Sequence, residues 1–199
     1  MKKGNALVAV LVILGFLALI GLFFMGSYNS LVRLEEGVTS AWSQVENVYQ
    51  RRLDLIPNLV ETVKGYAGHE KSTLQAVVEA RAQVGKMSIT SDTLTDPAKF
   101  EQFQQSQGAL SSSLSRLLVV AEQYPDLKAN QNFLQLQAQL EGTENRIAVE
   151  RGRFNEAAQA FNFIFSMFPT NVFGGLFGFK LKEYFKADAT AKTAPKVTF

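Results

Sequence analysis

The sequence predicts an all-α protein in which a single N-terminal transmembrane helix is followed by an antiparallel, up-and-down helical bundle. Two observations lead to this prediction. Residues 6–25, ALVAVLVILGFLALIGLFFM, hold no charged side chain. Beyond them, apolar residues recur at alternating spacings of three and four, which is the period of a helix that buries one face and not the period of a strand.

The apolar run has the length of a membrane span. Twenty helical residues at about 1.5 Å each cover roughly 30 Å, the thickness of a bilayer's hydrocarbon core. The alternative is a cleavable signal peptide, whose apolar region is about 7–15 residues long and is followed by small residues. Here the run is longer and leaves through the bulky residues 22–25, LFFM. We therefore expect an uncleaved anchor.

The charges that flank the run predict its orientation. Lys2 and Lys3 precede it, whereas Arg33 follows it and is offset by Glu35 and Glu36. The positive-inside rule then places the N-terminus in the cytoplasm and the bundle on the other side. We expect a single-pass protein of the bacterial cell (inner) membrane with an extracytoplasmic bundle.

Composition excludes several classes of function. The net charge is only +2 and basic residues are interspersed with acidic ones, which argues against nucleic acid as a partner. The chain has no cysteine, which excludes disulfides and thiolate metal sites.

The expected organisation has five parts: a basic N-terminus at 1–5, the anchor at 6–26, one bundle at 27–170, a Phe/Gly-rich amphipathic segment at 171–186 and a flexible tail at 187–199.

Within the bundle, Pro57 poses a choice between a kinked helix and a full turn. A proline removes an amide donor and collides with the preceding helical turn. An unbroken apolar seam favours a kink. The matched lengths of segments 28–56, 57–85 and 97–124 favour a turn, because antiparallel neighbours have similar lengths. With a turn, Arg52 would lie beside Glu61 and form an ion pair.

Other helix ends are marked by proline. Residues 86–96 read as a loop, and Asp96 followed by Pro97 is a typical helix start. Pro125 ends that helix at Tyr124, because the residue before a proline is pushed out of the helical region. The last helix then begins near Asp126 or Asn130 and runs to Met167, before Pro169.

Phenylalanine is concentrated near the C-terminus. Nine of the sixteen phenylalanines lie between Phe154 and Phe185. A chain that runs out, back, out and back brings this region down to the bilayer or to the base of an adjacent subunit. The candidate membrane or subunit contacts are Phe161, Phe165, Phe168, Phe173, Phe177 and Phe179. For Phe154, Phe161 and Phe165 a place in the core is an equal alternative.

Residues for catalysis are not evident. His69 is the one histidine, so no histidine pair can hold zinc. The glycine cluster at 174–178, GGLFG, lacks the lysine and the hydroxyl residue of a phosphate-binding loop. We predict no catalytic, cofactor-binding or metal-binding residue, no cofactor and no enzymatic activity.

Several motifs resemble the LemA family. They lie at Ala41–Val45 (AWSQV), at Arg51–Glu70 (RRLDLIPNLVETVKGYAGHE), at Glu122–Ala129 (EQYPDLKA), at Arg153–Asn155, at Phe161–Asn162 and at Phe168–Asn171. Phe154 stands where the family usually has tyrosine. The resemblance implies an N-terminal anchor and an antiparallel helical bundle, and it does not imply a catalytic site. We interpret the motif residues as residues that pack the bundle or lie at its turns: Trp42, Arg52, Pro57, Asn58, Tyr124, Pro125, Asn155, Asn162 and Pro169.

These features favour a membrane-anchored, non-enzymatic helical protein that self-assembles and organises membrane or cell-envelope structures. The alternative is an accessory subunit or regulator of a separate envelope enzyme or transporter. The expected partners are the lipid bilayer and further copies of the chain, or, in the alternative, another envelope protein.

Overall fold

The computed structural model describes residues 2–87 and 90–186, and every regular element in these ranges is helical. The elements are α1 (Lys2–Tyr66), α2 (Lys71–Gly85), the short 3₁₀ helix η1 (Ser91–Leu94), α3 (Pro97–Ala121), α4 (Pro125–Lys128), α5 (Gln131–Ser166) and α6 (Thr170–Leu176). The all-α prediction is confirmed. The predicted flexible tail, 187–199, lies outside the described residues.

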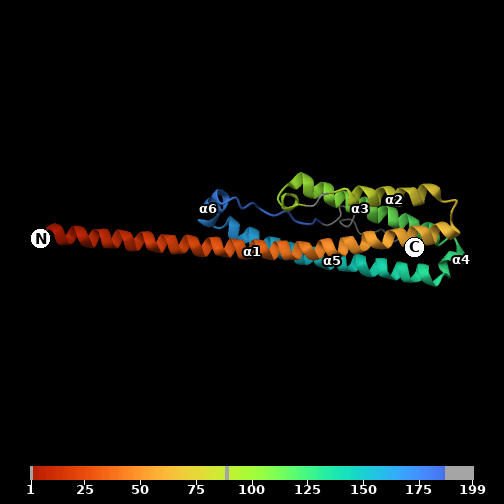
Figure 1. Ribbon diagram of the computed structural model, residues 1–199, viewed down its shortest axis with the longest axis horizontal. Coiled ribbons are helices and arrows are strands. Elements are labelled where there is room, and N and C mark those ends of the chain that lie inside the picture. Colours follow the sequence, from red (N-terminus) through yellow and green to blue (C-terminus); the bar gives the residue numbers. More distant parts are fainter. Residues whose placement is uncertain (1, 88–89, 187–199) are drawn as a thin grey trace, which may run out of the picture.

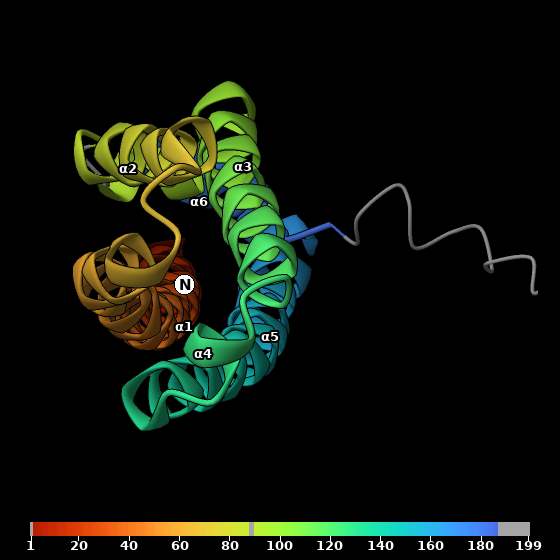
Figure 2. The ribbon, with the colours of Figure 1, turned by 90° about the vertical axis from the view of Figure 1, so that its right-hand side faces the viewer.

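The helices form an elongated body along the second half of α1 (Figure 1). α1 packs against α5, and α2 packs against α3. Figure 1 shows α2 returning beside the end of α1, α3 running outward again and α5 coming back to α6. Figure 2, along the long axis, shows α1, α2, α3 and α5 arranged around a common centre. η1 lies within the segment predicted as a loop.

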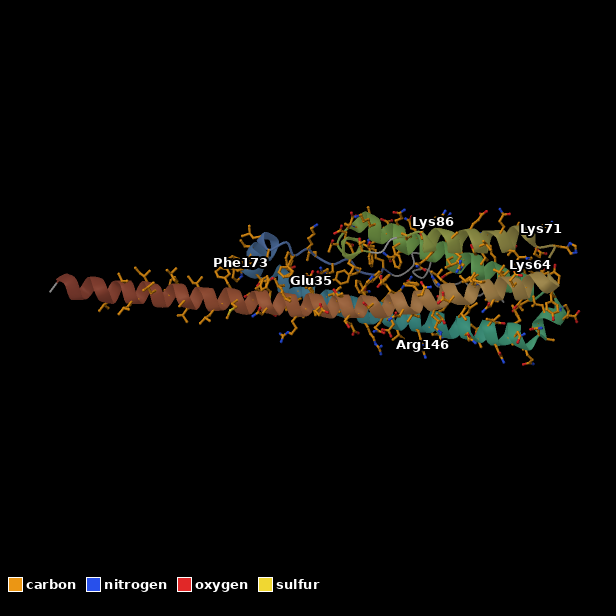
Figure 3. All side chains as sticks on the ribbon, viewed as in Figure 1. Glu35, Lys64, Lys71, Lys86, Arg146 and Phe173 are labelled. Atoms are coloured by element: carbon orange, nitrogen blue, oxygen red, sulfur yellow. The ribbon has the colours of Figure 1, made fainter. Side chains whose placement is uncertain are left out.

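The first part of α1 projects alone from this body. Its apolar stretch is long enough to cross a membrane, has a mean hydropathy of 2.6 and has no buried residue. Figure 3 shows side chains on both sides of this part of the helix with no other element beside them. A helix that is apolar on every side needs an apolar environment, and this one fits a single-pass membrane anchor.

α1 continues through Pro57, so of the two alternatives at this residue the full turn is wrong. The chain reverses after Tyr66 instead. Proline deprives the Leu53 carbonyl of its helical amide partner, and this carbonyl accepts a hydrogen bond from Nε of Arg81 in α2, at 3.1 Å. A side chain from the neighbouring helix thus takes over the missing bond, and the helix passes the proline without ending.

The ion pair predicted from that turn is also wrong. Because α1 does not reverse, Arg52 and Glu61 stay on one helix more than two turns apart. Arg52 pairs with Glu144 of α5, and Glu61 pairs with Lys64, one turn further along α1.

Proline marks the starts of α3 and α4. Asp96 caps α3, where its Oδ1 accepts hydrogen bonds from the backbone amides of Ala98 at 2.9 Å and Lys99 at 3.2 Å. Pro97 is the first residue of α3, as predicted. Pro125 opens α4 in the same way after Tyr124.

Two apolar clusters fill the bundle. The distal core surrounds Ile56 and Val63 of α1, at the end farthest from the N-terminus, and takes in α2, the second half of α3 and the start of α5. The aromatic core surrounds Trp42, with Phe100, Phe103, Phe154 and Phe185 among its members. Phe154 is completely buried, so of its two predicted environments it occupies the core.

Candidate functional site: a buried polar layer, a C-terminal strap and an aromatic base

A polar layer centred on Arg52 separates the two cores. The Arg52 side chain is 1 % exposed. Its Nη1 donates to Glu144 Oε1 at 2.6 Å and to Ser111 Oγ at 2.9 Å, and its Nη2 donates to Gln107 Oε1. A buried charge needs a counter-charge and further hydrogen bonds, and here α3 and α5 supply them to α1.

Arg52 is incompletely satisfied within the described part of the chain. Its Nε is buried and has no hydrogen-bond partner there. Glu144 is 43 % exposed and stands at the wall of a groove of about 440 Å³ between α3 and α5. Ser111 also lines this groove. Both groove residues accept hydrogen bonds from Arg52, so the wall of the groove is tied to the buried polar layer.

Tyr49, one turn before Arg52 on α1, is the centre of a second polar group. The Nε of Arg151 donates to the hydroxyl of Tyr49 at 2.7 Å, and its guanidinium lies 4.9 Å from the centre of the Phe185 ring. Burial raises the pKa of Tyr49 above its ordinary value of 10.0, while Arg151 and Arg52 act in the opposite direction. Tyr49 therefore remains a neutral acceptor at ordinary pH.

Asn155 and Asn162 hold an extended segment, residues 179–186, which we term the C-terminal strap. Asn155 bonds both backbone groups of Phe185: its Nδ2 donates to the carbonyl at 3.0 Å, and its Oδ1 accepts from the amide at 2.9 Å. Asn162 does the same for Lys182, with both distances 2.8 Å. Each asparagine thus acts as a two-point backbone clamp.

The spacing of the two clamps fits both the helix that carries them and the extended strap that they bind. Seven helical residues cover about 10.5 Å and three extended residues cover about 10 Å. The strap therefore runs against the direction of α5 with the two asparagines in register. The sequence marks Asn155 and Asn162 as motif residues seven positions apart, but it does not indicate the strap as their partner.

The strap also fastens other elements. The Nζ of Lys182 lies 2.5 Å from Glu35 Oε1 on α1, and the Glu183 amide donates to the Leu94 carbonyl of η1 at 2.8 Å. Lys182 and Glu35 are separated by 147 positions, and no periodic pattern in the sequence connects them.

The remaining motif residues are spread over the bundle. Trp42 is 5 % exposed within the aromatic core. Asn58 is exposed, and its carbonyl accepts from the Thr62 hydroxyl. The Tyr124 hydroxyl donates to Glu70 at 3.1 Å, and Pro169 immediately precedes α6. These residues do not converge on one site.

The end of α5 and α6 form an aromatic base against α1 (Figure 3). Phe173 meets Phe24 at 4.0 Å between ring centres, and Phe177 meets Tyr28 at 5.2 Å. α6 approaches α5 so closely that a Cβ on Gly174 would lie 2.7 Å from the Phe165 ring.

Two of the predicted contact residues prove to be core residues. Phe161 is completely buried and Phe179 is 8 % exposed, with their rings 6.2 Å apart. Phe179 begins the strap, which folds back along α5, and its ring packs on Phe161, so neither residue offers a surface to lipid or another subunit. Phe165 stacks on Phe161 and is partly buried. Phe168 and Phe177 remain 83 % and 61 % exposed.

Across the ranges that the structure describes, no three histidine, cysteine or acidic side chains lie close enough to hold a metal ion. His69 is exposed in the turn between α1 and α2. The polar layer, the asparagine clamps and the aromatic base hold the bundle together beside an apolar helix, and the fold defines a membrane-associated, all-helical protein.

The LemA family model matches residues 41–199, and the chain belongs to the LemA family. Among relatives, magnetosome protein MamQ 2 of Paramagnetospirillum magneticum is 27 % identical over 92 % of this chain and 73 % of its own length. MamQ of Magnetospirillum gryphiswaldense is 26 % identical over 92 % and 74 %. Protein LemA of Metamycoplasma hominis is 28 % identical over 80 % and 70 %.

Proposed function

We propose that this protein is a membrane-anchored, non-enzymatic helical protein that self-assembles and organises membrane or cell-envelope structures. The observation that carries the proposal is the continuity of α1 from Lys2 to Tyr66. One helix is both anchor and bundle member, so the bundle has a fixed orientation relative to the bilayer. Neighbouring copies with the same orientation can repeat the same lateral contact, which is what a closed or extended assembly requires.

The relatives support a structural role. The similarity to proteins named as magnetosome proteins extends over 92 % of the chain. Within the polar layer, the side chains of Ser111, Gln107 and Glu144 are occupied in binding Arg52. These groups stabilise a bundle and do not form a reactive pair.

The orientation that we propose has the N-terminus in the cytoplasm and the bundle outside the inner membrane. It rests on Lys2 and Lys3 before the span and on the balance of charges after it. Protease added to intact spheroplasts should then remove the bundle, while full protection would reverse the assignment.

Mass photometry and electron microscopy of the detergent-extracted full-length protein test self-assembly. We expect a ladder or a discrete ring of copies that persists on dilution. Monomers at every concentration would refute the proposal. One foreign protein co-purifying in fixed ratio from native membrane would instead identify the chain as an accessory subunit of that partner.

A linker variant tests the rigid connection. Replacing Gly26 and Ser27 with a flexible Gly/Ser linker should abolish the assembly and leave the bundle's melting temperature unchanged. The matched control replaces the same two residues with alanine, which preserves the helix; a Cβ on Gly26 meets no atom within 4 Å. Unchanged oligomers in the linker variant would reduce α1 to a simple tether.

A further inference from the structure

Exposed apolar side chains gather at one place on the bundle. Between Phe163 and Phe177 six large apolar side chains are 45–83 % exposed. We term them the apolar foot: Phe163, Met167, Phe168, Val172, Leu176 and Phe177. Elsewhere on the bundle, exposed apolar side chains such as Val78, Val119 and Val149 stand singly in the sequence. Single exposed residues are ordinary, whereas a gathered set marks a contact surface.

The apolar foot is fixed beside the end of the anchor. The contacts of Phe173 with Phe24 and of Phe177 with Tyr28 place α6 against the last turns of the apolar run. Figure 1 shows α6 next to α1 at the end of the bundle that faces the projecting N-terminal part. The close packing of Gly174 on Phe165 sets the distance of α6 from α5. The foot therefore reaches the depth at which the anchor leaves the bilayer.

The distribution of charge identifies the environment at this depth. Residues 4–32 of α1 carry no charged side chain, and neither do residues 157–179 at the end of α5, in α6 and beyond. Charges resume with Arg33 and Lys180 on the two segments. The pair between Lys182 and Glu35 then bridges the strap and α1 above this level. The last turns of the uncharged length of α1 lie beside α6, and on both segments charged residues begin just beyond this contact, where Lys182 pairs with Glu35.

We propose that the apolar foot inserts into the leaflet that surrounds the last turns of the α1 anchor, so that the protein meets the bilayer at two points. The occupant of this surface is lipid, because the anchor already places the foot at the boundary between headgroups and acyl chains, where aromatic and aliphatic side chains are stabilised. The proposal rests on the proposed membrane anchoring and is independent of self-assembly.

The absence of cysteine from the chain makes a direct test practical. Single cysteines replace Phe168 or Leu176, which are 83 % and 81 % exposed, and each carries a nitroxide label. The full-length protein is reconstituted into vesicles of phosphatidylcholine and phosphatidylglycerol. Electron paramagnetic resonance then compares collisions with oxygen, which dissolves in the hydrocarbon, and with a nickel chelate, which stays in water.

Two further single-cysteine variants serve as references for lipid and for water. Phe23→Cys reports the span, and Val119→Cys, 64 % exposed on α3, reports water. We expect the labels at 168 and 176 to resemble the label at 23, with oxygen accessibility several-fold higher relative to nickel than at 119. A foot label that behaves like the label at 119 overturns the proposal.

A second contrary outcome is a foot label that is shielded from both reagents and shows spin–spin broadening that disappears on dilution with unlabelled protein. That result would assign the surface to a second copy of the chain. A label at 23 that is itself in water would overturn the anchor and the foot together. Oligomeric state, measured separately by mass photometry, distinguishes failure of this proposal from failure of self-assembly.

Discussion

Arg52 of α1 and Glu144 of α5 form an ion pair of 2.6 Å at the junction of the two apolar cores. Removing one partner of a buried pair costs roughly 3–5 kcal/mol, because the other charge is left uncompensated. Glu144 is 43 % exposed, so solvent screening reduces the cost. We expect Glu144→Ala to lower the free energy of unfolding by about 1–3 kcal/mol, measured by denaturation of the full-length protein in detergent.

The double variant Arg52→Met with Glu144→Leu checks the reason for that loss. Apolar residues of similar volume can replace a buried pair at little cost. The double variant should therefore be more stable than Glu144→Ala alone. A double variant that is less stable would show that the hydrogen bonds to Ser111 and Gln107 dominate.

The bond between Arg81 and the Leu53 carbonyl should matter only because of Pro57. Arg81→Met leaves that carbonyl without its partner and should cost about 1 kcal/mol. In a Pro57→Ala background residue 57 supplies an amide, and the same substitution should cost less. A double-mutant cycle measures this coupling; equal costs in both backgrounds would mean that Arg81 acts by packing.

The two asparagine clamps should control the strap locally. Asn162→Ala leaves the Lys182 amide without its acceptor and should cost about 1–3 kcal/mol. Hydrogen exchange should become faster at the amides of residues 182 and 185 and change little in α2. Asn145→Ala, an exposed change on the same helix, is the control. Unaltered exchange in the strap would contradict the clamp.

Gly174 and Gly175 are neighbours, but we expect their substitution by alanine to have opposite effects on stability. A Cβ at 174 would lie 2.7 Å from the Phe165 ring, whereas a Cβ at 175 meets nothing within 4 Å. Gly174→Ala should destabilise the packing of α6 by roughly 1–3 kcal/mol, and Gly175→Ala should be neutral or slightly stabilising. Thermal melting and limited proteolysis near α6 measure both, and equal effects would contradict the close approach.

Tyr49 should make the bundle sensitive to alkaline pH. Its pKa in the folded protein is raised above 10.0 by burial, so between about pH 10 and the folded pKa the unfolded chain loses this proton and the folded chain retains it. The stabilising contribution is complete below about pH 10 and is lost as the pH rises through the folded pKa. Melting temperatures measured across this range should therefore fall.

Tyr49→Phe isolates this contribution from other groups that titrate in the same range. At about pH 8 it should be less stable by about 0.5–1.5 kcal/mol, because Arg151 loses its acceptor. Its further loss of stability at alkaline pH should be smaller than that of the wild type. Parallel curves for the two proteins would contradict a raised pKa for Tyr49.

The fold class could be predicted because its signals are local. An uncharged apolar run, a 3.6-residue period and an Asp96–Pro97 cap act within a few turns of helix, and the structure agrees with each. The choice between a kink and a turn at Pro57 stayed open, because the penalty of a proline depends on whether another group bonds the carbonyl that it leaves free. That group is Arg81, which is supplied by a different helix.

The candidate site was less predictable because its residues meet only in the folded chain. Arg52 and Asn162 stood out in the sequence, but nothing there indicates their partners Glu144 and Lys182. The environment of Phe179 depends on the strap folding back along α5, which the sequence does not indicate, so this residue was expected at a membrane or subunit contact although it lies in the core.

Because α1 is unbroken, a change in the tilt of its membrane-spanning part moves the whole bundle. From Met25 to Tyr66 the helix extends about 60 Å at ~1.5 Å per residue. Transmembrane helices change their tilt to match the thickness of the hydrocarbon layer, so a change of about 10° in the span would carry the far end of the bundle sideways by roughly 10 Å. A small difference in lipid thickness would thus become a large displacement at a distance from the membrane.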